Sequence, residues 1–159
     1  MGLYTTPYYK KIVILQKKAV RHIMNKKSNA HTNILFKELG LLTVHDLISF
    51  NQSLFIRKYK NLQLPDSFNN IYVKVEDVPA FRRTRNDDYN LAYQQPIKKQ
   101  YFFFPSIRCI NTFNALDIEI KSISEIKRFK QELLSYYFNR YDSECVKENC
   151  YSCNKHDIY

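Results

Sequence analysis

The chain of 159 residues contains only two glycines, Gly2 and Gly40, which lie 38 positions apart. A phosphate-binding P-loop, a dinucleotide-binding G-x-G-x-x-G turn and a G-x-S-x-G nucleophile elbow each need at least two glycines within a few residues. None of these motifs can be present in this sequence. The scarcity of glycine therefore excludes most nucleotide-dependent enzymes and the α/β-hydrolases.

Long apolar runs are also missing. No segment reaches the ~18 consecutive apolar residues of a membrane-spanning helix. The apolar run Ile12–Leu15 lies between lysines and is shorter than the core of a signal peptide, which has about 7–15 residues. These features predict an intracellular protein, nuclear or cytoplasmic, that is not secreted. In that compartment the four cysteines are expected to be reduced thiols or metal ligands rather than disulfides.

Acidic residues are absent from the first 37 positions, and Glu38 is the first of them. The whole chain has 25 Lys and Arg against 15 Asp and Glu, a net charge of +10. Eight of the basic residues lie in the acid-free segment, so the remaining 17 basic and 15 acidic residues contribute only +2. Positive charge concentrated at one end indicates a polyanionic partner, either nucleic acid or an anionic membrane surface. A solvated face that keeps the protein soluble is the alternative.

The hydrophobic periodicity of residues 8–26 predicts an amphipathic helix. Its apolar residues share one broad half, which we expect to pack in the core, although Gln16 interrupts it. Five cations share an arc of roughly 120° on the opposite side, and we expect them to face outward. They are Lys10, Lys11, Lys17, Lys18 and Arg21.

Two further helices are predicted in this basic N-terminal part. A short helix over 33–39 has Thr32 as its N-cap and Gly40 as a left-handed stop. The segment Thr43–Asp46 has the form of a capping box, with aspartate in the position usual for glutamate or glutamine. It begins a helix over about 44–60.

The middle of the chain shows no sustained helical period. Residues 65–104 contain three prolines and two short strand-like segments, at 71–75 and 101–104. Helical periodicity returns over 106–116 and again from Ser122 or Ser124 to about 141.

These patterns predict a mainly α fold, a small helical bundle with a long irregular, partly extended middle segment and a Cys-rich tail. The predicted parts are a basic helical unit (1–64), an irregular arm (65–104), C-terminal helices that pack on the first unit (105–141) and the tail (142–159).

The first predicted helix also carries a resemblance to a known family. Leu15–Ile23, with the sequence LQKKAVRHI, resembles a segment downstream of the catalytic core in LINE-type (non-LTR, jockey-like) retrotransposon reverse transcriptases. The order and spacing of several short segments carry the resemblance over roughly residues 8–141. Beyond the first, they are His31-Thr32, Leu35-Phe36, Leu39–Leu42, Asp46-Leu47, Leu64-Pro65, Thr84–Asn86, Pro105–Ile107, Phe113–Leu116, Phe129-Lys130, Leu133 and Tyr136.

Two departures from the family pattern bear on function. Phe113–Asp117 stands where the family often has Trp-Asn-x-Leu-Pro, so an aspartate replaces a helix-breaking proline. The Tyr/Phe-x-Asp-Asp motif that holds the metal ions of the polymerase is missing, and Asp87-Asp88 stands in a different context. The resemblance therefore implies a C-terminal segment, from the thumb or beyond, of a reverse transcriptase polyprotein without its catalytic core.

The resemblance implies a non-enzymatic role for this segment. Its parent would be an RNA-directed DNA polymerase, and the segment would bind nucleic acid and position the RNA template–primer. The implied partners are RNA or an RNA–DNA hybrid and the upstream reverse transcriptase core. One alternative is an interaction module whose basic helix docks on an acidic protein or membrane surface. Another is a degenerate retrotransposon remnant without activity.

The candidate nucleic-acid contacts come from two parts of the chain. The first is the set of five cations on the helix over 8–26. The second is Arg82, Arg83 and Arg85, because guanidinium groups bind phosphate oxygens bidentately. Aromatic residues that follow could stack on exposed bases, namely Tyr89, Tyr93, Tyr101 and Phe102–Phe104. Alternatively, these aromatics belong to the core and the arginines pair with Asp87 and Asp88.

The tail contains the one candidate cofactor site. Cys145, Cys150, Cys153 and His156 form the pattern C-x₄-C-x₂-C-x₂-H, a ligand set that suits tetrahedral zinc. A disordered terminus with free thiols is the alternative, because only the Cys150–Cys153 spacing is the usual one.

Catalytic constellations are weaker, and we assign no catalytic residue. Cys109 is expected to be a packed core cysteine rather than a nucleophile served by His22, His31 or His45. Glu76-Asp77 and Asp87-Asp88 are expected to be solvated loop charges rather than the metal ligands of a nuclease.

Overall fold

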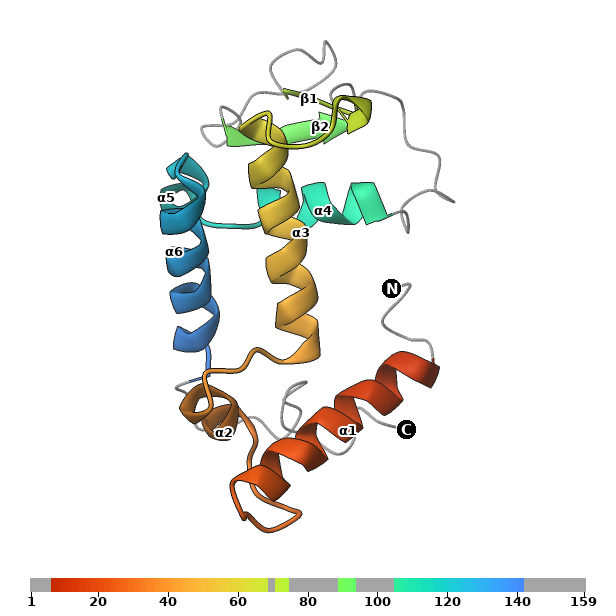
Figure 1. The fold of residues 1–159 in the computed structure, drawn as a ribbon, viewed down its shortest axis with the longest axis vertical. Coiled ribbons are helices and arrows are strands. Elements are labelled where there is room, and N and C mark those ends of the chain that lie inside the picture. Colours follow the sequence, from red (N-terminus) through yellow and green to blue (C-terminus); the bar gives the residue numbers. More distant parts are fainter. Residues whose placement is uncertain (1–6, 69–70, 75–88, 94–104, 142–159) are drawn as a thin grey trace. The chain divides into compact units, whose positions relative to one another are not determined.

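A computed structural model describes residues 7–68, 71–74, 89–93 and 105–141 (Figure 1). The described residues are mainly helical, as the sequence predicts. The elements are α1 (Pro7–Ile23), α2 (Asn33–Glu38), α3 (Val44–Lys60), a 3₁₀ turn η2 (Asp66–Phe68), β1 (Tyr72–Lys74), β2 (Leu91–Tyr93), α4 (Pro105–Asn114), α5 (Ile118–Ser122) and α6 (Ile126–Asn139).

The chain divides into two compact units, and the boundaries lie inside helices. Among the described residues, 7–47 and 134–141 form the first unit, and those between 48 and 133 form the second. The first turn of α3 and the last turns of α6 therefore belong to the first unit. This division differs from the change near residue 64 that the sequence suggests.

The first unit packs α1, α2 and the end of α6 around a small aromatic core. The rings of Phe36 and Tyr141 lie with their centroids 6.5 Å apart, and Phe36 is completely buried. The other buried apolar residues of this unit are Tyr9, Val20, Leu35, Leu42 and Tyr137.

Left-handed residues end α1 and α2. Asn25 has φ 50°, its N–H donates to the His22 carbonyl, and the Lys26 N–H reaches back to the Arg21 carbonyl at 2.8 Å. This Schellman motif ends α1 at Ile23, three residues before the predicted end. Gly40, with φ 63°, ends α2 in the same way, as predicted. Thr32 occupies the N-cap position of α2 but makes no capping hydrogen bond with its side chain.

The N-terminus of α3 is held by three side chains. Thr43 Oγ1 accepts the Asp46 N–H (3.2 Å) and donates to Asp46 Oδ2 (2.7 Å), so the predicted capping box is present. The Tyr141 hydroxyl accepts the Thr43 N–H at 3.0 Å and donates to the same Asp46 oxygen. Gln16 Oε1 accepts the Val44 N–H at 2.9 Å, and Gln16 Nε2 donates to the Leu42 carbonyl. Gln16 interrupts the apolar half of α1 because it caps α3.

In the second unit, a two-stranded antiparallel sheet pairs Val73 of β1 with Ala92 of β2, at the C-terminal end of α3 (Figure 1). Helix side chains bond to the backbone of both strands, which leaves fewer open edge groups. The Tyr59 hydroxyl donates to the Tyr72 carbonyl at 2.8 Å. The Asn114 amide donates to the Leu91 carbonyl (2.9 Å) and accepts the Leu91 N–H (3.2 Å).

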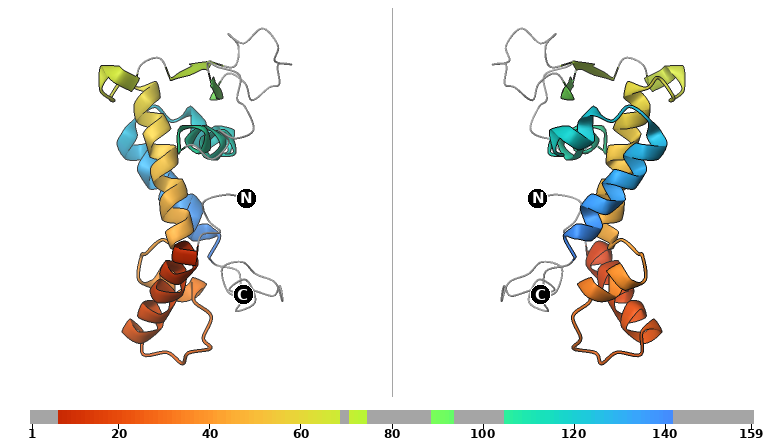
Figure 2. Two further views of the ribbon diagram at one scale, coloured as in Figure 1. Left: turned by 90° about the vertical axis from the view of Figure 1, so that its right-hand side faces the viewer. Right: turned by 90° about the vertical axis from the view of Figure 1, so that its left-hand side faces the viewer.

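Helix α4 lies roughly perpendicular to α3 (Figures 1 and 2), and its residues supply part of the core of the second unit. Phe113 and Phe129 are completely buried, with ring centroids 6.3 Å apart. The remaining buried apolar residues of this unit are Ile56, Tyr72, Leu91, Ile107, Cys109, Ile110, Leu116, Ile120 and Leu133.

The predicted elements from α3 onward agree in part with the structure. Helix α3 has its predicted bounds, α4 lies within one to two residues of them, and the strand-like segment 71–75 is β1. Strand β2 and helix α5 were not predicted. Ile123 has an extended backbone (φ −70°, ψ 114°), so the last long helix starts at Ile126 rather than at Ser122 or Ser124. The predicted strand at 101–104 lies outside the described residues.

Leu62 should be a position where glycine stabilises the protein. It follows α3 with φ 54° and is 80% exposed, so its side chain gains little from packing. The left-handed conformation costs a residue other than glycine ~1–2 kcal/mol in the folded state. Glycine avoids this strain but loses ~0.5–1 kcal/mol more in conformational entropy on folding. Leu62→Gly should raise the free energy of unfolding by about 0.5–1 kcal/mol, measured by thermal denaturation.

The matched control is Gly40→Ala. A Cβ at Gly40 would have no atom within 4 Å, so the substitution tests backbone strain alone. It should lower the free energy of unfolding by about 1 kcal/mol. A Leu62→Gly variant that melts below the parent chain would show that Leu62 makes a stabilising contact.

Candidate nucleic-acid interface

Helix α1 buries only part of the apolar half that the sequence predicts. Tyr9, Val20 and Lys17 are buried, and Val13 and Met24 are half-buried. Lys17 is only 7% exposed, so the prediction that it faces outward is wrong. The apolar half of α1 is wider than the core requires. The helix buries one edge of that half, and the long aliphatic part of Lys17 extends the buried edge.

Arg21 is half-buried and organises the loop between α1 and α2. Its Nε donates to the Ala30 carbonyl at 2.8 Å, and its own carbonyl accepts the Lys26 N–H. A turn from Lys27 to Ala30, with a 3.0 Å hydrogen bond, completes the loop. Arg21 therefore holds this loop in place and differs from the solvated cation that the sequence predicts.

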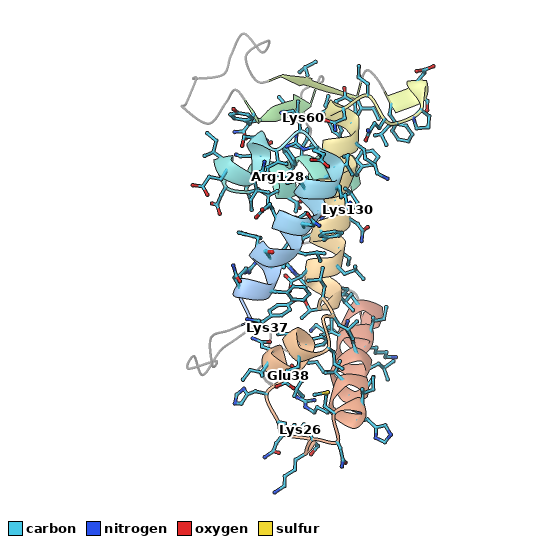
Figure 3. The ribbon with its side chains drawn as sticks, turned by 60° about the vertical axis from the view of Figure 1, so that its left-hand side comes forward. Lys26, Lys37, Glu38, Lys60, Arg128 and Lys130 are labelled. Atoms are coloured by element: carbon cyan, nitrogen blue, oxygen red, sulfur yellow. The ribbon has the colours of Figure 1, made fainter. Side chains whose placement is uncertain are left out.

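The outward cations of the first unit lie on α1, on this loop, on α2 and at Arg140, just after α6. Lys26 and Lys27 are exposed at the loop, next to exposed Ser28 and Asn29. Figure 3 labels Lys26 there and Lys37 on α2. The exposed lysines of this unit are Lys11, Lys18, Lys26, Lys27 and Lys37, whereas Lys10 is half-buried.

Negative charge is scarce on the same unit. Its described residues include two acids, Glu38 and Asp46. Glu38 is exposed, but Asp46 is 6% exposed and bonded within the α3 cap. The surface that the described residues form is therefore strongly positive, which favours polyanions.

The second unit has a surface of mixed charge. An open groove of ≈ 620 Å³ is lined by Glu119, Glu125, Glu132 and Arg128, together with two serines and two isoleucines at the α5–α6 junction. The buried cations of the second unit, Arg57 and Lys121, form hydrogen bonds with groups within that unit. The three glutamates repel phosphate, so this groove does not extend the basic surface.

Comparisons with protein-family models, with curated proteins and with solved structures find no match to this chain.

Several predicted site residues lie outside the described part of the chain. They are the arginines Arg82, Arg83 and Arg85, and the candidate zinc ligands Cys145, Cys150, Cys153 and His156. Over the described ranges, no group of three or more His, Cys, Asp or Glu is placed to hold a metal ion. No helix in these ranges is long and apolar enough to cross a membrane.

Cys109 lies in the core, as predicted, with 8% of its surface exposed. Burial raises the pKa of its thiol to about 11, so the reactive thiolate is scarce at neutral pH. Cys109 is a packing residue of the second unit.

Lys26 and Lys27 are exposed cations of this surface that are not among the candidate contacts predicted from the sequence. Lys26 is the last residue of the predicted helix and lies outside its cationic arc, and Lys27 follows that helix. The signal that includes them is the acid-free segment of the first 37 residues.

Proposed function

We propose that this chain is a non-catalytic, nucleic-acid-binding segment from the C-terminal part of a LINE-type reverse transcriptase polyprotein. In the parent protein it positions the RNA template–primer by contacts to the phosphate backbone. The observation that carries the proposal is the positive surface of the first unit, where Lys26 and Lys27 are displayed on a loop fixed by Arg21. The ordered resemblance over residues 8–141 supports the choice of family.

Contacts to phosphate, rather than to bases, suit this surface. Lysine is a flexible point charge that meets phosphate oxygens without reading sequence. Phe36, Phe113 and Phe129 are completely buried. Every other aromatic residue whose burial the structure describes is buried or half-buried, so none of these rings is displayed as an exposed stacking platform. Binding should therefore depend little on base sequence and strongly on salt.

The proposal assigns no reaction to the chain. Polymerisation requires carboxylates that hold two metal ions, and the Tyr/Phe-x-Asp-Asp sequence of the family is missing from the 159 residues. The segment would act through the affinity and placement of the nucleic acid in the parent protein.

Replacing Lys26 and Lys27 together by Gln should weaken the salt dependence of RNA binding. Each lost phosphate contact lowers the slope of log K against log salt by about 0.9 for a duplex and about 0.7 for a single strand. The double variant should therefore reduce the slope by about one and a half to two units, measured by fluorescence anisotropy across a salt series. Both side chains are exposed, so the free energy of unfolding should change by less than about 0.5 kcal/mol each.

The matched control removes the same charge from the second unit. Lys127 and Lys130 are exposed on α6, and Figure 3 labels Lys130 there. Replacing both by Gln should leave the slope unchanged. An equal loss of slope in both variants would indicate a general charge effect. An unchanged slope in the Lys26/Lys27 variant would refute this site, and Arg82, Arg83 and Arg85 would then be replaced next.

A further inference from the structure

Helix α1 exposes a row of apolar side chains to solvent. Ile12 is 51% exposed, and Leu15 and Ile23 are each 64% exposed. Ala19, also exposed, lies between them. With spacings of three, four and four residues these side chains follow one another along the same side of the helix, over about 16 Å at 1.5 Å per residue. We name Ile12, Leu15, Ala19 and Ile23 the apolar stripe.

The apolar stripe is separate from the face that α1 packs in its own unit. Tyr9, Lys17 and Val20 are buried on that face, and Gln16 lies beside it, where it caps α3. The stability of the unit does not account for three large apolar side chains left half or more exposed along one side of the helix. Single exposed apolar residues are ordinary, whereas a continuous group marks an interaction surface.

Two exposed lysines border the stripe at a coiled-coil spacing. Lys11 and Lys18 lie one heptad apart. If Ile12 and Ala19 are assigned to position a of the heptad, Leu15 takes position d and both lysines take position g. Ile23 then takes position e, next to the exposed His22 at position d. Residues at position g select the charge of the partner helix, because they form ion pairs across the interface. The exposed side of α1 thus has an apolar seam with positive charge along one edge.

We propose that the apolar stripe docks an amphipathic helix of a partner protein that carries acidic residues beside its own apolar seam. The partner's apolar residues pack on Ile12, Leu15 and Ile23, and its carboxylates meet Lys11 and Lys18. The stripe spans only about 80° of the helix circumference, which suits a helix–helix seam better than the broad apolar face that lies on a membrane. A second copy of α1 fits poorly, because in antiparallel pairing its lysines would meet these lysines.

This inference is independent of the proposed function. Nucleic-acid binding is assigned to the loop lysines Lys26 and Lys27, whereas docking is assigned to the apolar stripe. Substitutions in the stripe therefore separate the two activities.

The test uses the full chain and a helical peptide of three heptads, with leucine at positions a and d and glutamate at e and g. A second peptide has lysine at e and g. The glutamate peptide should bind, and the lysine peptide should bind at least roughly tenfold more weakly. Leu15→Gln and Ile23→Gln should each weaken the binding of the glutamate peptide roughly tenfold, because each removes a buried apolar contact. Circular dichroism checks that each variant keeps its helices.

Charge reversal provides the sharpest comparison. Replacing Lys11 and Lys18 together by Glu should reverse the preference, so that the lysine peptide binds more tightly than the glutamate peptide. Replacing Lys26 and Lys27 together by Glu makes the same charge change away from the stripe and should leave the preference unchanged. The RNA salt slope of Leu15→Gln should equal that of the parent chain.

Three results would overturn the inference. Binding of the glutamate peptide that is unaffected by Leu15→Gln and Ile23→Gln would show plain electrostatic attraction. An equal effect of the two charge reversals would show the same. Binding to phosphatidylserine vesicles, together with no binding to the glutamate peptide, would assign the stripe to a membrane surface.

Discussion

Replacing Arg57 by alanine should lower the free energy of unfolding by about 2–5 kcal/mol, the range for removing a large buried side chain. Arg57 is 4% exposed. Its guanidinium carbon lies 5.3 Å from the ring centroid of Phe113 and 4.8 Å from that of Phe129. One guanidinium nitrogen donates to the Lys121 carbonyl, in the last turn of α5. Alanine would leave a cavity between the two rings and remove the donor to that carbonyl.

The charge of Arg57 contributes less than its volume. Burial lowers the pKa of the guanidinium, which shows that the site disfavours the charged form. Its Nε has no hydrogen-bond partner among the described residues. The desolvation cost therefore offsets much of what the ring contacts and the hydrogen bond to Lys121 supply. An apolar side chain of similar length should supply most of the stabilisation that Arg57 contributes.

Methionine and lysine distinguish these contributions. Arg57→Met should cost less than about 1.5 kcal/mol, because it keeps the volume and removes the buried charge. Arg57→Lys should cost more than methionine, since its compact ammonium is more strongly hydrated and does not stack on rings. Urea denaturation measures the free energy of unfolding of all three variants. Lys58→Met, at a half-buried neighbouring position, is the control for replacing a basic residue by methionine. An alanine variant within about 0.5 kcal/mol of the parent chain would contradict this account.

Local signals predicted the helices whose ends depend on nearby residues. The capping sequence Thr43–Asp46 and the left-handed Gly40 lie next to the elements that they start or end, so α3 and the stop of α2 followed from the sequence. The end of α1 was missed because Asn25 takes the left-handed conformation that glycine more often takes. Boundaries set by such a residue are hard to read from a hydrophobic period alone.

The face that α1 buries depends on residues far away in the sequence. Gln16 bonds to the backbone 26 and 28 positions further along the chain, and these contacts fix which edge of a wide apolar half is buried. Periodicity alone does not distinguish the apolar residues of that half that are buried from those that are exposed. Lys17 was therefore predicted to face outward, and the apolar stripe was not predicted. Strand β2 was not predicted for a similar reason. Its residue Leu91 is held by hydrogen bonds to Asn114, which lies 23 positions away in the sequence.

The hydrogen-bonded group of Thr43, Asp46 and Tyr141 joins the start of α3 to the end of α6 within the first unit. Burial raises the pKa of the Asp46 carboxyl, but hydrogen bonds from His45, Tyr141 and Thr43 and the charge of Arg140 outweigh it, so the net pKa is lowered. Burial and the hydrogen bond to Asp46 raise the pKa of the Tyr141 phenol. Charged Asp46 and neutral Tyr141 are thus the forms that the folded state favours.

The two pKa shifts define a pH window for this stabilisation. The contribution of Asp46 is present above its unfolded pKa of about 3.9 and is lost as the pH falls through the lower folded value. The contribution of Tyr141 is present below its unfolded pKa of about 10 and is lost as the pH rises through the higher folded value. The group should therefore stabilise the protein most between about pH 4 and pH 10.

Tyr141→Phe should lower the free energy of unfolding by about 2–4 kcal/mol within this window, because one substitution removes two hydrogen bonds, one of them to a buried carboxylate. The difference between the parent chain and the variant should begin to shrink below about pH 4, where Asp46 becomes protonated in the unfolded chain, and above about pH 10, where the phenol ionises in the unfolded chain. Chemical denaturation at a series of pH values measures this difference, and Tyr136→Phe, one residue before the buried Tyr137, serves as the control. The control should change stability little at any pH. A difference for Tyr141→Phe that stays constant from pH 3 to pH 11 would mean that the hydroxyl acts through packing alone, and that the charge of Asp46 has no part in holding the two helix ends together.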